Sequence, residues 1–234
     1  MSSSLETIQR RVVRCRRCPE LRAYCRRIAR TGKPEFAGQT YWGKPVPSLG
    51  RTSARLLVVG LAPAAHGGNR TGRMFTGDGS AAWLSRAMHR AGFATAPKSI
   101  HRGDGFELID AVITAALRCA PPANKPTRDQ LRKCAVHMRA ELAALPRLRV
   151  AIGLGKIGFD AAVDRFREAG YGIPTGRPRF GHGVEYAFAS PNGRTALSLI
   201  GCYHPSRQNT NTGTLTEDML DAVFSRARVL LQDR

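Results

Sequence analysis

The sequence is short of acidic residues and of long apolar runs, and both shortages narrow the class of protein. It has 17 Asp and Glu residues against 37 Lys and Arg residues, a formal net charge of +20. Such a surplus indicates a polyanionic partner, nucleic acid before membrane. No apolar run approaches the ~18 residues of a membrane span, and the start MSSSLETIQRRVV lacks the apolar core of a signal peptide. We expect no membrane association and a place in the reducing cytoplasm, beside the nucleoid.

Nucleotide-binding motifs are also missing. The glycine-rich stretch 60–79 contains neither GxxxxGK[ST] nor GxGxxG, so a nucleotide-binding protein that uses this loop for phosphate is a weak hypothesis. Lysine is scarce, and Lys44, Lys98 and Lys156 lie outside the two polar motifs described below. No lysine therefore offers itself as a Schiff-base nucleophile, and we expect no strand cleavage by lyase chemistry.

The most informative stretch is RLLVVGLAPAAHGGNRTGRMFTGDG, residues 55–79. Its apolar run at 56–59, ended by Gly60, is typical of a strand buried on both faces of a parallel sheet. The polar loop that follows would lie at the carboxyl end of this strand, where open α/β sheets bind ligands. It carries Phe75, an aromatic platform, and Asp78, a carboxylate. The alternative is a solvated loop in which Asp78 only caps the next helix.

Strand and helix patterns alternate along the rest of the chain. Apolar runs predict strands at 56–59, 108–117, 150–154 and 197–203, and helical patterns cover 81–91, 127–145, 159–169 and 216–231. Residues 5–30 predict a basic helix interrupted near Pro19, 31–54 an extended loop, and 170–195 a hairpin or irregular excursion. The alternation predicts an α/β fold: a single three-layer α/β/α sandwich around a mostly parallel four-stranded sheet. We expect one domain, 1–234, with a basic, cysteine-bearing arm at 1–54.

Four of the six cysteines have the spacing of a metal site. Cys15 and Cys18 form a C-x2-C pair, and Cys119 and Cys134 lie 15 residues apart. Thiolates hold zinc or iron–sulfur clusters, and spacing alone hardly separates the two, although the wide second pair favours a cluster. Cys202 falls in a predicted strand, where it is most simply a buried thiol.

Two motifs resemble those of a known family. The run GLAPAAHGGNRTGRMFTGD resembles the first motif of the family 5 (B-type) iron–sulfur uracil-DNA glycosylases, and HPSRQNTNTG, 204–213, resembles their last motif. The likeness extends from Cys15 to the final helix. It implies a monomeric, monofunctional DNA glycosylase that flips out and hydrolytically excises uracil, and other deaminated bases such as hypoxanthine, from double-stranded DNA in base excision repair. It also implies a [4Fe–4S] cluster on Cys15, Cys18, Cys119 and Cys134.

Removing a base requires an oriented water, negative charge near the sugar and a donor for the departing base anion. The extruded base also needs an aromatic face. We assign Phe75 as the platform, Asp78 as the carboxylate for water and cation, and His204 as the anion-stabilising donor. The resemblance supports these roles. The full predicted set adds Asn124 as a water-holding residue and Gly60 and Ala62 as base-binding residues.

Three further features bear on specificity. The loop at 206–213 resembles the family's minor-groove wedge, and its predicted DNA-binding residues are Ser206, Arg207, Gln208, Asn209 and Asn211. The segment after Gly60 has no polar residue, which leaves water activation to Asp78 or to stabilisation of the cation. Ala115 stands where related iron–sulfur glycosylases carry a uracil-reading asparagine, so we expect a broad lesion range.

The competing hypothesis is a non-catalytic basic iron–sulfur protein that binds nucleic acid.

Overall fold

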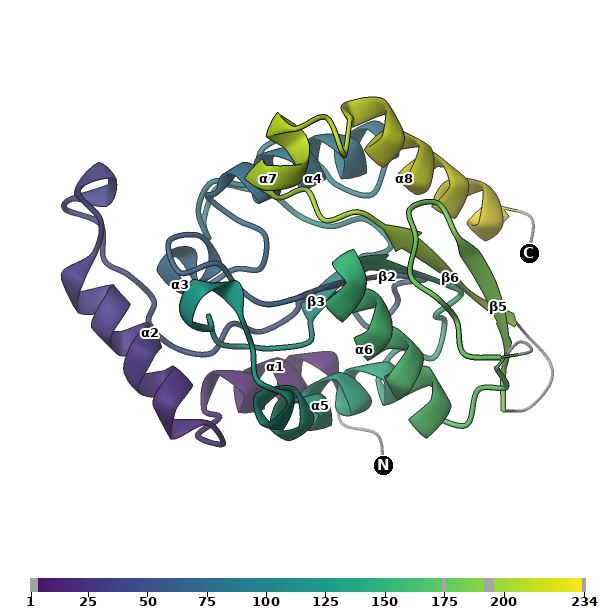
Figure 1. Ribbon diagram of the computed structural model, residues 1–234, viewed down its shortest axis with the longest axis horizontal. Helices are drawn as coiled ribbons and strands as arrows, with labels where there is room; N and C mark the ends of the chain where they lie inside the picture. The colour runs from purple at the N-terminus through teal and green to yellow at the C-terminus, as the bar shows by residue number, and fades with distance from the viewer. Residues whose placement is uncertain (1–3, 174–175, 192–195, 233–234) are drawn as a thin grey trace.

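The computed structural model describes residues 4–173, 176–191 and 196–232, and within them a six-stranded sheet lies between two layers of helices (Figure 1). The strands are β1 (Leu49–Gly50), β2 (Leu56–Gly60), β3 (Ala111–Ala115), β4 (Val150–Leu154), β5 (Glu185–Ala189) and β6 (Ala196–Cys202). Their order is β1-β3-β2-β4-β6-β5. The α/β sandwich is confirmed.

The prediction of four strands is incomplete. The four predicted strands β3, β2, β4 and β6 are all present and parallel, but antiparallel β1 and β5 extend the sheet at its edges. Sequence periodicity did not reveal these two, because β1 has only two residues and β5 is largely exposed. Edge strands lack the continuous apolar run that marks a buried parallel strand.

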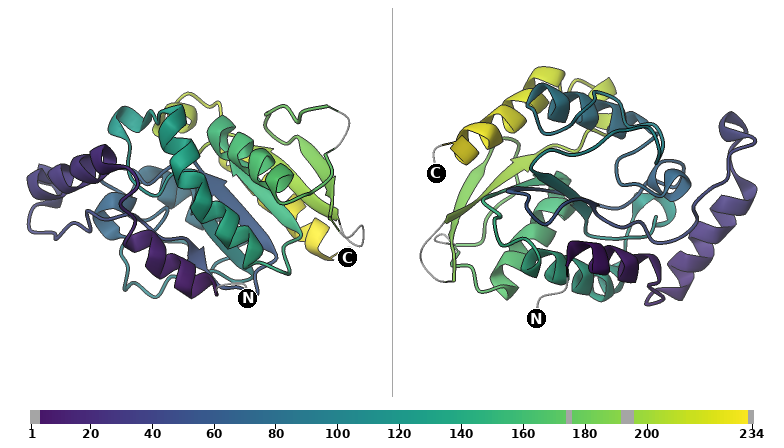
Figure 2. Two further views of the ribbon diagram at one scale, coloured as in Figure 1. Left: turned by 90° about the horizontal axis from the view of Figure 1, so that it is seen from below. Right: turned by 180° about the vertical axis from the view of Figure 1, so that it is seen from behind.

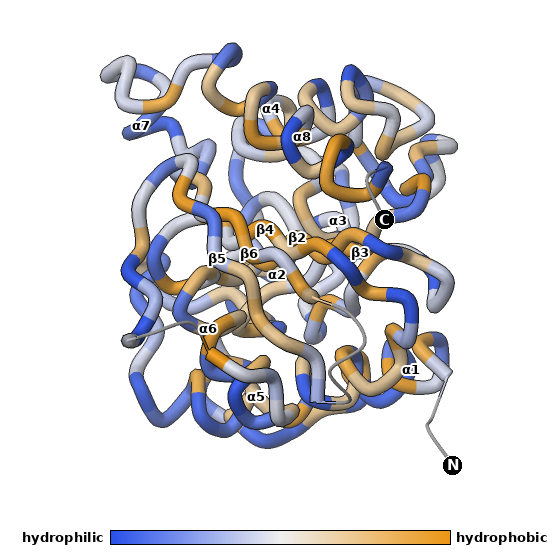
Figure 3. The backbone as a smooth tube through the Cα atoms, turned by 90° about the vertical axis from the view of Figure 1, so that its right-hand side faces the viewer, coloured by the Kyte–Doolittle hydropathy of each residue, from blue (hydrophilic) through white to orange (hydrophobic). Residues whose placement is uncertain are grey.

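The helices divide between the two faces of the sheet. They are α1 (Leu5–Val13), α2 (Pro19–Thr31), α3 (Gly68–Thr71), α4 (Gly79–Arg90), α5 (Arg128–Ala143), α6 (Gly155–Glu168), α7 (Arg207–Asn211) and α8 (Glu217–Gln232), with single 3₁₀ turns η1 (Pro34–Phe36) and η2 (Pro122–Asn124). Helices α4 and α8 cover one face, and α1, α5 and α6 cover the other (Figure 2). Apolar residues concentrate along the central strands (Figure 3). None of the described helices is long and apolar enough to cross a bilayer.

Helix boundaries follow capping chemistry. Thr127 and Gln130 form the predicted capping box of α5, and the Thr216 hydroxyl accepts a hydrogen bond from the Met219 amide at the start of α8. Helix α6 begins at Gly155, directly after β4 and earlier than the predicted start at residue 159, and Gly155 has a left-handed φ of 73°. Among the described residues no side chain caps α6, so its start carried no sequence signal.

The four parallel strands end at one edge of the sheet, and the loops that follow β2 and β6 meet there. Helix α3 lies in the loop after β2, and α7 lies in the loop after β6. The segment 206–213 was expected to be a loop, but it includes the short helix α7. The Ser206 hydroxyl accepts a hydrogen bond from the Asn209 amide and so caps this helix. This edge is where α/β sheets place their ligands.

Candidate active site and cysteine pocket

Phe75 and His204 face each other at the carboxyl edge of the sheet. Phe75 lies in the loop after β2 and His204 directly follows the last strand, yet their ring centroids are 5.8 Å apart with an interplanar angle of 35°. Such an arrangement supplies an aromatic surface beside an imidazole. The structure thus brings together two of the residues that the sequence singled out from distant motifs.

The position of Phe75 depends on its neighbours in the sheet. A Cβ placed on Gly60 would come within 2.7 Å of the Phe75 ring, so only glycine leaves room for it. Phe75 itself has a positive φ of 45°, a conformation that costs free energy for a residue with a side chain. Gly60 pairs in register with Ala115 of β3, which is buried and offers only a methyl group beside the ring.

Asp78 is both a helix cap and a partly buried carboxylate. Its Oδ1 accepts a hydrogen bond of 2.9 Å from the Ala81 amide at the start of α4. Its Oδ2 lies against Gly67, where a Cβ could not fit. Burial raises the pKa of Asp78, and hydrogen bonds from the Ala81 and Ser80 amides oppose this shift. Asp78 therefore does cap α4, but its hydrogen bond with the Ala81 amide uses only Oδ1 of the two carboxylate oxygens.

His204 is a neutral imidazole at pH 7, because burial lowers its pKa to about 4. Its backbone carbonyl accepts a hydrogen bond of 2.9 Å from the Asn209 side chain and one of 2.7 Å from the Ser206 amide. A Cβ on Gly155, where α6 begins, would stand 3.3 Å from the His204 Cβ. A neutral ring held in this way can donate one N–H to an anion without carrying a charge itself.

Two arginines in the loop after β2 stabilise this loop through hydrogen bonds and an ion pair inside the protein. Arg70 donates to the carbonyls of His66 and Gly77 at 2.7 and 2.6 Å. Arg73 is buried and forms a 2.7 Å ion pair with Asp104. Burial, the largest single effect, raises the pKa of Asp104, but the hydrogen bonds from Arg73 and from the backbone amides of Ile100, Phe106 and His101 together outweigh it, and the pKa is lowered. The guanidinium groups of both arginines are therefore directed into the protein and not toward a ligand.

The remaining predicted site residues differ in their surroundings. Asn124 is exposed in η2 with a left-handed φ of 55°, and Ala62 packs against the cysteine-bearing cluster. Arg207, Gln208 and Asn211 are exposed on α7. The other two predicted DNA-binding residues make contacts within the protein. Ser206 caps α7, and the Asn209 side chain donates a hydrogen bond to the backbone carbonyl of His204.

The four predicted metal ligands line one pocket. Cys15 and Cys18 come from the segment before α2, Cys119 from the segment after β3, and Cys134 from α5. Within the described ranges, no group of three or more His, Cys, Asp or Glu side chains converges closely enough to hold a single metal ion. A [4Fe–4S] cluster is held by four cysteine thiolates, and these four cysteines come together at one pocket.

The cations around this pocket also suit an anionic cluster. Arg22 and Arg118 line it, and Arg22 Nη1 and Arg118 Nε and Nη1 are buried with no hydrogen-bond partner in the described part of the chain. Arg118 Nη2 is held by Glu141 at 2.5 Å. Buried donors of charged groups are costly when unpaired, so these N–H groups are available to cluster sulfur. Sequence reasoning missed both arginines, although Arg118 directly precedes Cys119.

Burial also affects the protonation of these cysteines in the absence of metal. Burial raises the pKa of Cys18, and it raises the pKa of Cys134 to about 11. Without metal these thiols are therefore neutral, whereas metal binding requires thiolates and releases protons. Cys25 is buried in α2 with its thiol 3.6 Å from the carbonyl of Ala120, so the leftover cysteine of the N-terminal helix lies next to the ligands rather than apart from them.

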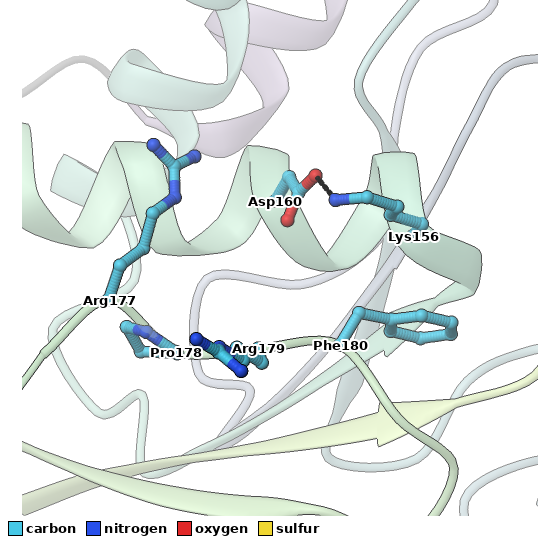
Figure 4. Close-up of a pocket in the computed structure, with 6 residues that line it drawn as sticks. All are labelled: Lys156, Asp160, Arg177, Pro178, Arg179 and Phe180. Carbon is cyan, nitrogen blue, oxygen red and sulfur yellow. Dashed lines mark hydrogen bonds and ion pairs between the residues drawn. The ribbon is translucent and has the colours of Figure 1, made fainter.

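A separate hollow lies between α6 and the segment before β5. It is lined by Lys156, Asp160, Arg177, Pro178, Arg179 and Phe180 (Figure 4). Lys156 is held by Asp160 at 2.6 Å and Arg177 by Asp164 at 3.2 Å, so two of its three cations are compensated. It contains none of the predicted site residues, and we assign no chemistry to it.

Comparison with known proteins identifies relatives along most of the chain. A family model described as the uracil DNA glycosylase superfamily matches residues 47–228. A protein of Thermus thermophilus named Type-5 uracil-DNA glycosylase is 44% identical over 216 residues, which cover 92% of this chain and 93% of that protein. Proteins of the same name from Mycobacterium tuberculosis and Pyrobaculum aerophilum are 43% and 42% identical over 92% and 93% of this chain, covering 78% and 89% of their own lengths.

Proposed function

The chain belongs to the uracil DNA glycosylase superfamily, and from that premise we propose that it is a monofunctional uracil-DNA glycosylase that acts on bases flipped out of double-stranded DNA. It is a hydrolase of N-glycosyl bonds, as its 41–44% identical relatives named Type-5 uracil-DNA glycosylase indicate. The observation that supports the proposed mechanism best is the pairing of the Phe75 and His204 rings beside the loop that carries Asp78.

In this mechanism the extruded base stacks on Phe75, within reach of His204. The bond between C1′ of deoxyribose and the base nitrogen breaks, and the electron pair leaves with the base. The neutral His204 donates a hydrogen bond to this anion, which a partly buried, preformed donor stabilises more than water does. Asp78 stabilises the positive charge that develops on the sugar. Water then bonds to C1′, and its proton neutralises the base.

Phe75 and Ala115 together favour a broad range of deaminated bases. An aromatic platform accepts any base, because every base has a flat π face. Ala115, beside Gly60, has no polar group to read the edge of the base. A pocket without a dedicated reader rejects analogues poorly, since nothing in it is left unpaired by the wrong base. We infer that uracil and hypoxanthine are both substrates.

The exposed side chains of α7 suit the role of a wedge. Gln208 and Asn211 are neutral and polar, and Arg207 adds one cation close to Gly79 at the start of α4. Side chains of this kind can fill the space that a flipped nucleotide leaves in the duplex. Asn209 takes a different part, since it holds the backbone of His204 and so positions the imidazole.

Cys15, Cys18, Cys119 and Cys134 would hold the [4Fe–4S] cluster. Hydrolysis transfers no electrons, so the bound cluster would supply a covalent tie between the start of α2, the end of β3 and α5. Arg22 and Arg118 would offset its negative charge with their free N–H donors. Asn124 follows Cys119 closely in the chain, and we keep it as the water-holding residue.

The decisive experiment is release of free base from a panel of duplexes that each contain one lesion. The proposal expects release of uracil and of hypoxanthine, with the DNA strand left intact until alkali is added. Release of uracil alone would overturn the broad range. Tight binding without release of any base would instead support the competing hypothesis of a non-catalytic iron–sulfur nucleic-acid-binding protein.

A further inference from the structure

The basic residues of this protein differ in whether a carboxylate pairs with them. On α4, α5 and α6 the cations of several turns are held by carboxylates: Arg86 and Arg90 by Glu217, Arg139 by Glu168, and Lys156 by Asp160. Around α2 the pattern is different. In the described ranges no ion pair involves the arginines from position 16 to position 30, namely Arg16, Arg17, Arg22, Arg26, Arg27 and Arg30.

Three of these six arginines share one face of α2. Leu21 and Cys25 are buried and fix the inner face of the helix, whereas Arg26, Arg27 and Arg30 are exposed. Helical spacing places these three arginines opposite the two buried residues. The outer face of α2 therefore presents three cations that have no carboxylate partner among the described residues.

Helix α2 is fixed beside the candidate active site. The Asn69 side chain of α3 donates to the carbonyl of Cys25 at 3.3 Å, and α3 belongs to the loop that carries Phe75. A Cβ on Gly43 would stand 2.8 Å from the Ala29 Cβ, so the chain passes close behind the helix. Figures 1 and 2 show α2 at the outer edge of the molecule, next to α3.

We propose that the outer face of α2, formed by Arg26, Arg27 and Arg30, is a surface that binds the phosphate backbone of DNA beside the lesion. This inference rests on the proposed function, because it takes duplex DNA as the partner. Guanidinium groups with no carboxylate partner can engage phosphate without first breaking an ion pair. The cysteine pocket at the start of α2 then has a consequence for DNA binding, since it fixes the helix that presents these cations.

The test compares two variants that lose the same formal charge. One is Arg26→Gln, Arg27→Gln, Arg30→Gln. The matched control is Arg51→Gln, Arg139→Gln, Arg226→Gln, whose exposed arginines are paired with Glu107, Glu168 and Glu185. Affinity for an undamaged duplex is measured against salt concentration, and melting curves verify that both variants are folded.

The α2 variant should lose up to about 2.7 from the magnitude of the slope of log affinity against log salt, because each phosphate contact contributes ~0.9. The control variant should keep the wild-type slope. A wild-type slope in the α2 variant, or equal losses in both variants, would overturn the proposal. Because binding is measured on undamaged DNA, a wild-type protein that fails to release uracil would contradict the proposed function and leave this measurement valid.

Discussion

The ring of Phe75 occupies the space in which a side chain on Gly60 would begin: a Cβ there would stand 2.7 Å from Cε2 and 2.8 Å from Cζ of the ring. The Gly60→Ala substitution must therefore displace the ring or distort β2. We expect a loss of stability of about 1–3 kcal/mol from overpacking and a fall in the single-turnover rate of uracil release. The double variant Gly60→Ala, Phe75→Leu should recover stability but not rate. Recovery of both would show that the Phe75 ring does not hold the base.

His204 should contribute to the rate of base release and not to the affinity for DNA. Removing a donor to a developing anion typically costs 10²–10³ in rate, about 2.7–4 kcal/mol, so His204→Ala should lower the single-turnover rate by this order. Affinity for uracil-containing duplex should change little, since phosphate contacts supply most of it. His89→Ala, at an exposed position of α4, serves as the control. Weakened binding with an unchanged rate would contradict the role.

Two histidines with lowered pKa values should make stability depend on pH. Burial lowers the pKa of both His204 and His137 to about 4, below the value of ~6.5 in an unfolded chain. Between these values the unfolded state binds more protons, so the free energy of unfolding should fall as pH falls from 6.5 to 4, by up to about 1.4 kcal/mol per unit for each histidine. The measurement is the urea midpoint against pH, and His137→Gln should flatten the curve. Parallel curves for wild type and variant would refute this.

The cysteine pocket predicts the colour of the protein. Material purified without oxygen should be brown and contain iron and sulfide in equal amounts. Cys134→Ala should abolish the colour, whereas Cys202→Ala should keep it, because Cys202 is buried in β6 outside the pocket. A colourless wild-type protein that contains zinc would contradict the cluster.

The sequence predicted the central fold because each parallel strand is a continuous buried run with glycine or polar residues after it. It could not predict β1 and β5, whose residues are too few or too exposed to form a pattern. Phe75 and His204 could be selected individually from their motifs, and the structure places their rings 5.8 Å apart. The hydrogen bond from Asn209 to the His204 backbone could not be predicted from the sequence, because that contact depends on how α7 folds back.

Arginine shows the limit of composition most clearly. The net charge of +20 indicates a polyanion but gives no indication of which cations are free to bind it. Arg73 and Arg118 are buried inside the protein, whereas Arg26 and Arg30 are exposed on α2. Only the arrangement of carboxylates in three dimensions separates these cases, and charge patterns along the chain do not encode it.

The central claim is that Asp78 contributes charge to catalysis and does not merely cap α4. Asparagine caps a helix about as well as aspartate, so Asp78→Asn keeps the bond to Ala81 and removes only the charge. The most direct measurement is single-turnover release of uracil from a uracil–guanine duplex by this variant, with a melting curve beside it and Asp129→Asn, at the exposed start of α5, as the control. We expect a folded Asp78→Asn protein whose rate is lower by orders of magnitude, each factor of ten being about 1.4 kcal/mol, and a control at wild-type rate. A folded Asp78→Asn variant that releases uracil at the wild-type rate would contradict it.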